Sequence, residues 1–365
     1  MRGDPTRQAH MLLGMTADDF IPQDHPIRAI REIVQGVLGE LSATFDAMYK
    51  AKGRPSVPPE HLLKASLLMA LYTVRSERQF CERLRYDILF KWFLGLNLDD
   101  PAFHPTTFTH NRERFLEHDV AGAFLGAVVR EAQRRKLISE DHFTADGTLL
   151  QAWASTKSYR PRDGAPPSDG GGRNPDVDFH GERRSRETHA STTDPEALLF
   201  KKARGEAAKL CFSGHLLTEN RHGLVLDVLL TQATGTAERD AVVTMLDRQQ
   251  ERKQGVTLGA DKAYDTQGMI ASLEEREVIG HIAQNTSGRK SAVPDAIAQS
   301  SGYMLSQRRR KLVEEVFGWM KTVGGLRKLR YIGLAKNQLC VTFTAALYNI
   351  VRMVSLSAQV GAAAA

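Results

Sequence analysis

The sequence predicts an α/β protein in which a mixed sheet with flanking helices follows an all-α N-terminal domain. Residues up to about Leu137 have a helical pattern, whereas strand-like segments begin near Ile138. A chain of 365 residues is also longer than one ordinary core requires. We therefore expect two domains, residues 1–137 and residues 138–365.

The first domain is expected to consist of short helices joined by tight turns. Ser76 and Gln79 match a capping box, and Gly95 is a typical helix end. Arginines are spread along these segments, which fits a helix-turn-helix-like DNA-binding module. A small helical bundle without a DNA role fits the same residues equally well. The expected helices cover residues 61–74, 76–84 and 86–94, and one follows Thr106-Thr107.

The second domain begins with one strand, continues with a β-hairpin and then alternates helices with strands. This order is typical of a mixed sheet covered by helices. The expected strands are residues 142–150, 211–218, 224–231, 256–260 and 278–283, and the expected helices are residues 237–250, 266–277, 308–324 and 337–356.

Residues 155–209 interrupt this pattern and are rich in Gly, Pro, Ser, Asp and Arg. Such a composition does not bury a core, so we expect most of the segment to be an exposed, mobile insertion. It is either a spacer or an arm that contacts DNA.

Composition favours a soluble globular protein, with 42% hydrophobic and 25% charged residues. The longest apolar segment, residues 341–360, contains Asn349 and Arg352 and fits a buried or amphipathic helix better than a membrane span. The N-terminus lacks the apolar stretch of a signal peptide. Three widely spaced cysteines predict neither disulfides nor a cysteine zinc site. We expect a cytoplasmic protein with no membrane partner.

The net charge of +6 permits a polyanionic partner, and the distribution of charge is more informative than the total. Between Ser306 and Lys336 there are nine Lys/Arg and two Glu. A solvated basic helix face and a nucleic-acid contact both explain this stretch.

Asp146 lies inside an expected strand, where Asp and the following Gly147 are unfavourable residues. One explanation is a tight Asp-Gly turn. The flanking residues do not alternate like two hairpin arms, which favours a functional carboxylate instead.

Asp261 directly follows the short apolar strand 256–260. Functional groups often lie at the carboxyl ends of strands in open α/β sheets. A loop or helix-capping role is the alternative, but Asp265, next to Thr266, is the better candidate for a cap.

Glu314 lies in an expected helix that also carries Gln307, Arg310 and Lys321. At about 100° per residue, these four side chains fall within roughly 60° of one another. The helix would therefore present one acid flanked by cations. An ordinary surface pair between Arg310 and Glu314 is the alternative.

Two aspartates on neighbouring strands and a helix glutamate form a chemically coherent set. Divalent ions such as Mg²⁺ prefer carboxylate oxygens and retain water ligands, so a few carboxylates suffice. Two such ions can stabilise the attacking and leaving oxygens in phosphodiester cleavage. Neighbouring Lys and Arg would hold the DNA backbone in register.

At these residues the sequence resembles the DDE transposases of bacterial insertion sequences, in the branch with a Tyr-Arg-Glu-Lys signature. Arg310, Glu314 and Lys321 match the signature in spacing, whereas Gln307 stands at the Tyr position. Asp146-Gly147-Thr148 and Asp261-Lys262-Ala263-Tyr264-Asp265 resemble the two aspartate motifs, and Pro105-Thr106-Thr107-Phe108 resembles part of the N-terminal module. The likeness covers roughly residues 10–350.

The resemblance implies that residues 1–137 bind DNA and that residues 138–365 form an RNase H-like catalytic domain. It implies that Asp146, Asp261 and Glu314 bind two Mg²⁺ ions, for which Mn²⁺ can substitute. It also implies that Gln307, Arg310 and Lys321 contact DNA.

The implied reaction is cleavage and strand transfer of double-stranded DNA, at the inverted repeats of the element and at the target. Because two ends must be brought together, a homodimer is expected. A catalytically inactive repeat-binding protein and a repair nuclease of the same fold are the alternatives.

Overall fold

The structure is a computed structural model that describes residues 14–49, 56–162, 187–201, 207–249 and 253–364, with side chains up to residue 359. The N-terminal part is helical, as predicted. Its helices are η1 (Ala17–Phe20), α1 (Ile27–Glu40), α2 (Ser42–Ala47), α3 (Pro59–Leu71), α4 (Glu77–Arg83), α5 (Ile88–Leu94), α6 (Thr106–Glu117) and α7 (Val120–Arg134).

Local signals set several of these boundaries. The Ser76 hydroxyl accepts a hydrogen bond from the Gln79 backbone N–H and begins α4, and Asp87 caps α5 in the same way. Gly95 ends α5 with a φ of +85°, a left-handed conformation that favours glycine.

The C-terminal part is built on a mixed sheet with the strand order β4-β5-β1-β7-β8, in which β4 is Leu198–Phe200, and β6 pairs with β5. β1 (His142–Gln151), β5 (Lys209–Glu219) and β6 (Val225–Gln232) are antiparallel neighbours, while β7 (Thr257–Ala260) and β8 (Ile279–Ile282) continue the sheet parallel to β1. The helices are η2 (Thr156–Ser158), α8 (Ala237–Arg248), η3 (Lys262–Tyr264), α9 (Gln267–Glu274), α10 (Asp295–Ala298), α11 (Ser301–Arg309), α12 (Leu312–Thr322) and α13 (Leu334–Ala364). The predicted α/β class, a mixed sheet with flanking helices after an all-α N-terminal part, is confirmed.

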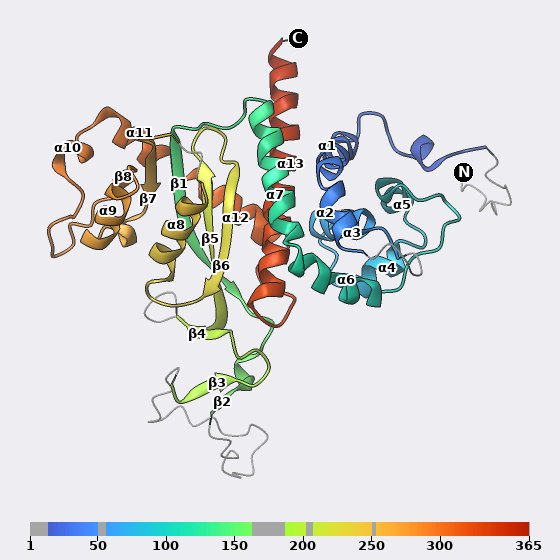
Figure 1. Ribbon diagram of the computed structural model, residues 1–365, viewed down its shortest axis with the longest axis horizontal. Helices are drawn as coiled ribbons and strands as arrows, with labels where there is room; N and C mark the ends of the chain where they lie inside the picture. The colour runs from blue at the N-terminus through green and yellow to red at the C-terminus, as the bar shows by residue number, and fades with distance from the viewer. Residues whose placement is uncertain (1–13, 50–55, 163–186, 202–206, 250–252, 365) are drawn as a thin grey trace, which may run out of the picture.

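Helices α8 and α12 cover opposite faces of this sheet (Figure 1). Successive residues of a strand point to opposite faces. Gly147 faces Glu238 of α8, and Thr148, the next residue of β1, contacts Lys321 of α12. The middle of β1 is therefore sandwiched between the two helices.

Helices α7 and α13 lie side by side between the sheet and the N-terminal helices (Figure 1). Their buried side chains belong to one hydrophobic cluster that extends from α1 to the sheet. The N-terminal helices are therefore joined to the main sheet by a continuous core.

Side chains of helix α13 also form hydrogen bonds with backbone groups along the outer edge of β6. Asn349 is fully buried; its side-chain oxygen accepts a hydrogen bond from Val225 N at 2.8 Å, and its side-chain nitrogen donates to Val225 O at 2.7 Å. Gln338 makes similar bonds to Leu230 N and Val228 O. These amides pair backbone groups that an edge strand otherwise leaves open, which explains why Asn349 interrupts an apolar helix.

We expect Asn349→Leu to destabilise the protein by roughly 2–4 kcal/mol, because it leaves both polar backbone groups of Val225 buried and unpaired. Urea unfolding monitored by circular dichroism measures the change. Cys340→Ser, a half-buried substitution on the same helix, is the control, and it should cost clearly less. Equal stabilities of the Asn349→Leu variant and the wild type would contradict this account of the edge.

By length and composition, α13 contains one segment apolar enough to cross a membrane, Leu334–Gln359. Within that segment, 72% of the most apolar window is buried against the rest of the protein. This burial is typical of a core helix.

The expected insertion at residues 155–209 has structure in its described parts. β2 (Tyr159–Pro161) pairs with β3 (His189–Ser191), and β4 (Leu198–Phe200) extends the main sheet along β5. Residues 163–186 and 202–206, on which much of the predicted mobility rests, lie outside the described residues.

The single helix expected at residues 308–324 is wrong. α11 ends at Arg309 and α12 begins at Leu312, with a tight turn at Arg310 and Lys311. The turn coincides with a tertiary contact, because the side-chain nitrogen of Gln307 is tied to the His281 carbonyl of β8. Gln307 and Arg310 therefore do not share one continuous helix face with Glu314 and Lys321.

Candidate active site

Asp146 lies in the middle of β1, with Leu216 of β5 opposite it in the antiparallel register. The Asp-Gly turn considered from the sequence is therefore wrong. The Asp146 Oδ1 atom accepts a hydrogen bond from Gly147 N at 2.8 Å. Its carboxylate is held at a fixed place on the sheet.

Asp261 follows the last residue of β7, the strand that pairs with β1 in parallel. Because Thr144 is paired with Gly259, two further residues along each strand bring Asp146 and Asp261 to the same level. The Asp261 Oδ1 atom accepts a hydrogen bond from Ala263 N at 2.8 Å, which orients the carboxylate at the start of η3.

Asp265 does not cap α9, contrary to the expectation from the sequence. Thr266 is the cap, and its hydroxyl accepts a hydrogen bond from Met269 N. Asp265 is fully buried and accepts hydrogen bonds from Asn285 N at 2.6 Å and Ala292 N at 2.8 Å. It fixes the loop after β8, which leaves Asp261 as the acid that faces Asp146.

The acidic groups of the site influence one another. Burial, the hydrogen bond from the Gly147 backbone and the charges of Asp261, Glu238 and Arg310 together raise the pKa of Asp146 to about 6; burial and the two acids raise it, whereas the hydrogen bond and Arg310 lower it. Burial and the charge of Asp261 also raise the pKa of Glu238. These carboxylates therefore repel one another at neutral pH.

The positive charge of Arg310 acts on Asp146 and lowers its pKa, whereas Arg239 acts on Glu238. The Arg310 Cβ atom lies 3.5 Å from the place that a Cβ on Gly259 of β7 would occupy, so Arg310 packs next to this strand. The Gln307 Oε1 atom accepts a hydrogen bond from Arg310 Nε at 3.1 Å. Gln307 thus bridges β8 and Arg310, because its amide nitrogen already donates to His281.

Lys321 donates a hydrogen bond to the Thr148 hydroxyl, two residues beyond Asp146 on the same face of β1. Glu314 is exposed on the first turn of α12 and precedes Lys321 by seven residues, which puts the two side chains about 20° apart around the helix. Both therefore face the same way.

Helix α12 runs along β1 in the same direction as the strand. Leu312 packs against Gly223 in the β5–β6 connection, which lies near the start of β1, and Lys321 lies near its end. Seven helical residues rise about 10 Å, the length of about three strand residues. Glu314 is therefore level with the Ala145–Asp146 part of β1.

Glu238 was missed as a site residue from the sequence. It lies in the first turn of α8, and its carboxylate fills the space beside the Cα of Gly147. In the sequence, an acid near a helix start has an ordinary explanation in the helix dipole, although Glu238-Arg239 is also one of the segments that resemble the family.

The chemistry of the acidic side chains bears on whether a divalent metal ion fits between them. In the described part of the chain, no group of three or more His, Cys, Asp or Glu side chains is arranged so that it could hold a metal ion. Asp146 and Asp261 nevertheless supply hard oxygen donors, and their mutual repulsion is what a cation between them would relieve. The residues present fit a divalent ion.

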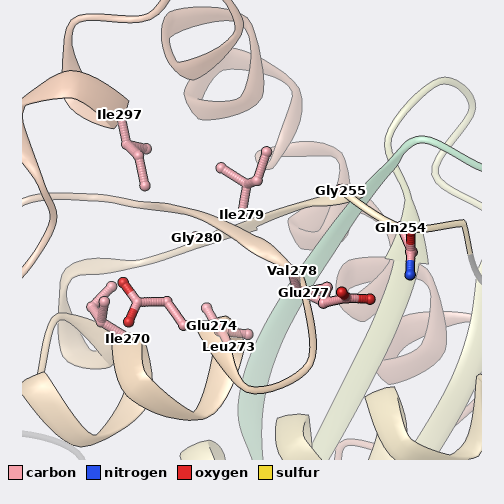
Figure 2. Close-up of a pocket in the computed structure, with 10 residues that line it drawn as sticks. All are labelled: Gln254, Gly255, Ile270, Leu273, Glu274, Glu277, Val278, Ile279, Gly280 and Ile297. Atoms are coloured by element: carbon pink, nitrogen blue, oxygen red, sulfur yellow. The ribbon is translucent and has the colours of Figure 1, made fainter.

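A separate pocket of about 360 Å³ lies between α9, β8 and α10 (Figure 2). Its lining is mainly apolar and includes Ile270, Leu273, Ile279 and Ile297. Neither Asp146 nor Asp261 contributes to it, so this pocket is distinct from the acidic site.

Two family models match the chain. A transposase domain (DUF772) matches residues 15–114, and a transposase DDE domain matches residues 185–350. The chain belongs to the DDE transposases. A comparison with curated proteins finds no match. The Asp261 and Glu314 positions both fall inside the segment that matches the DDE domain.

Solved structures with a likeness to this transposase are distant. A piggyBac transposase synaptic complex with hairpin DNA has a TM-score of 0.41 and 10% identity, covering 92% of this chain and 76% of that chain. A pre-cleavage Mos1 transpososome has a TM-score of 0.21 and 12% identity, covering 84% and 82%. A Mos1 mariner paired-end complex with Mn has a TM-score of 0.21 and 12% identity, covering 93% and 88%.

Membership of the family establishes the general activity. The protein is an enzyme of DNA transposition that binds DNA and uses divalent metal ions. An inactive repeat-binding protein is not favoured.

Proposed function

We propose that this transposase cuts DNA at the terminal inverted repeats of an insertion sequence and joins the freed ends to target DNA. Asp146, Asp261 and Glu314 are the catalytic carboxylates, and together they hold two Mg²⁺ ions, which Mn²⁺ replaces. The observation that carries this proposal is the placement of Asp146 and Asp261 on adjacent parallel strands, at one level, with Arg310 beside them.

Two transfers at one site account for the reaction. Bound divalent ions would stabilise the attacking and leaving oxygens of an in-line displacement at phosphorus. In the first transfer a water oxygen attacks the phosphate at the element end, and the 3′ oxygen leaves as a hydroxyl. In the second that hydroxyl attacks a target phosphate and displaces the 3′ oxygen of the target strand.

We propose that the positively charged side chains around the carboxylates bind the DNA backbone. Arg310 and Lys321 lie on the same side of β1 as Asp146, which suits them to hold phosphates next to the reacting group. Gln307 acts through Arg310, because both ends of its amide are used within the protein. This role explains how Gln307 serves where the Tyr-Arg-Glu-Lys signature has Tyr.

Synapsis of two element ends favours a homodimer on DNA, because each end needs an active site. Light scattering of the protein with a duplex carrying one end measures this directly. Two chains and two duplexes per complex are expected, and one chain with one duplex at all concentrations would rule the dimer out.

The proposed activity is tested by incubating purified protein with an end-labelled duplex that carries an element end, together with a target plasmid. Denaturing gels should show a Mg²⁺-dependent cut at the repeat boundary and labelled strands joined to the plasmid. Retardation of the duplex without a cut would favour the repeat-binding protein. Cuts without joined products would favour the nuclease.

The raised pKa of Asp146 predicts the pH dependence of the reaction. The folded protein holds this proton up to about pH 6, whereas an ordinary Asp loses it near 3.8. The stabilising effect of the protonated group is present below pH 3.8 and is lost as the pH rises through about 6, so at neutral pH the ionised group destabilises the metal-free protein.

Metal binding requires the ionised form, and therefore the cleavage rate at limiting Mg²⁺ should fall about tenfold per pH unit below pH 6. A pH series at two Mg²⁺ concentrations checks this, because more Mg²⁺ should move the midpoint to lower pH. A midpoint that does not respond to Mg²⁺ would contradict the assignment to Asp146.

A further inference from the structure

Glu238 has the environment of a site residue although it lies on α8, across the sheet from α12. It is half-buried, and in the described part of the chain its carboxylate has neither an ion pair nor a hydrogen-bond partner. Asp261 has the largest charge effect on its pKa, and the charge of Arg239 opposes that effect only in part. A half-buried carboxylate that faces another carboxylate without an ion pair or a hydrogen bond of its own costs stability.

Gly147 is what allows Glu238 to approach the catalytic strand. A Cβ on Gly147 would lie 2.8 Å from Glu238 Oε1 and 2.9 Å from Glu238 Cγ, closer than real side chains approach. With glycine there, no side chain separates Glu238 from the backbone next to Asp146. The residue after the catalytic aspartate is thus small because a second carboxylate occupies its place.

Tyr264 supplies an independent observation. Its ring is 0% exposed, and its hydroxyl is buried with no hydrogen-bond partner among the described residues. Burial and then the negative charges of Glu238, Asp146 and Asp261 raise the pKa of this hydroxyl well above its ordinary value, so all three acids lie within its electrostatic reach. A buried hydroxyl without a partner in such a place indicates a missing acceptor, such as a water or a reoriented carboxylate.

We propose that Glu238 is a further carboxylate of the metal site and that the Tyr264 hydroxyl donates a hydrogen bond to a water or carboxylate of that site. This inference rests on the proposed function. Two divalent ions carry four positive charges, and Glu238 with Asp146, Asp261 and Glu314 carries four negative ones. Helix α8 thus contributes to catalysis from the face opposite α12.

A purely structural role for Glu238 is a weaker explanation. An acid in the first turn of a helix stabilises the helix dipole, but the exposed Asp240 in the same turn already does so. Asp240 points to solvent, without crowding Gly147. It is therefore a matched control with the same charge on the same turn.

The test is Mn²⁺ binding, followed by electron paramagnetic resonance of the free ion, with the full-length wild type, Asp146→Asn, Glu238→Gln and Asp240→Asn. Thermal unfolding without metal is measured alongside. Glu238→Gln should weaken Mn²⁺ binding at least about tenfold, the scale on which metal sites respond to lost partners, while Asp240→Asn binds like the wild type. Without metal, Glu238→Gln should unfold at the same or a higher temperature, because it relieves repulsion.

The outcomes separate this inference from the proposed function. If Asp146→Asn weakens Mn²⁺ binding but Glu238→Gln binds like the wild type, the role of Glu238 is wrong and the proposed function stands. A lower unfolding temperature of metal-free Glu238→Gln with unchanged Mn²⁺ affinity would show a structural role and also overturn the inference. If the wild type binds no Mn²⁺, or if Asp146→Asn binds it normally, the proposed metal site itself fails.

Discussion

Asp146→Asn is expected to reduce the rate of Mg²⁺-dependent strand cleavage at least about a thousandfold, the scale on which loss of one member of a catalytic unit acts. Asn keeps the size and the place of Asp146 in β1, where its backbone pairs with β5. It removes the negative charge that a divalent ion requires. Single-turnover cleavage of an end-labelled duplex measures the rate.

DNA binding by this variant should be unchanged or tighter, because a negative charge is removed near the backbone phosphates. Asp141→Asn is the matched control, since Asp141 is exposed just before β1 and pairs with Lys253 at the surface. It should cleave like the wild type. Equal cleavage rates for Asp146→Asn and Asp141→Asn would show that Asp146 is not a catalytic residue.

Glu314→Gln is expected to reduce cleavage at least about a hundredfold while leaving folding intact. Glu314 is exposed and level with Asp146, on the same side of α12 as Lys321, so its carboxylate can close on an ion held by the two aspartates. The measurement is the same single-turnover assay, at saturating Mg²⁺.

Glu315→Gln provides the control for this substitution, since Glu315 is the exposed neighbour on the same turn and points about 100° away. It should have little effect. If Glu314→Gln keeps full activity while Glu238→Gln loses it, the third catalytic carboxylate comes from α8 and the assignment of Glu314 is wrong.

Local patterns were sufficient to predict the elements that carry the aspartates. The apolar residues around Asp146 and those before Asp261 fit strands because these strands are covered by helices. The hairpin of β5 and β6 was predicted for the same reason, with boundaries within two residues of those observed. Periodicity was informative wherever burial alone determines the structure.

Contacts between distant segments could not be predicted in this way. The helix break at Arg310 coincides with the bond between Gln307 and the His281 carbonyl, and no local pattern encodes that partner. Asn349 looked like an interruption of an apolar helix, although it pairs the open edge of β6. In both cases a polar side chain forms a hydrogen bond with a backbone group that is remote in sequence.

The place of Glu238 at the site also depends on a contact between distant segments, which local patterns could not predict. In the sequence it is an ordinary acid near a helix start, and Gly147 is an ordinary strand-weakening glycine. The two residues come together only because α8 packs against β1. Gly147 has no side chain, and the carboxylate of Glu238 occupies the space that one would fill. Asp265 was misjudged for a similar reason, since its partners lie about 20 residues or more further along the chain.

The central claim is that Asp146 and Asp261 hold the divalent ion at which DNA is cut. Crystals of the protein with a duplex carrying an uncut element end, soaked in Mn²⁺, test it by anomalous scattering. We predict a Mn²⁺ peak bound by carboxylate oxygens of both aspartates, next to the phosphate at the repeat boundary. A Mn²⁺ ion bound elsewhere while the DNA in the crystal is cut would contradict the claim.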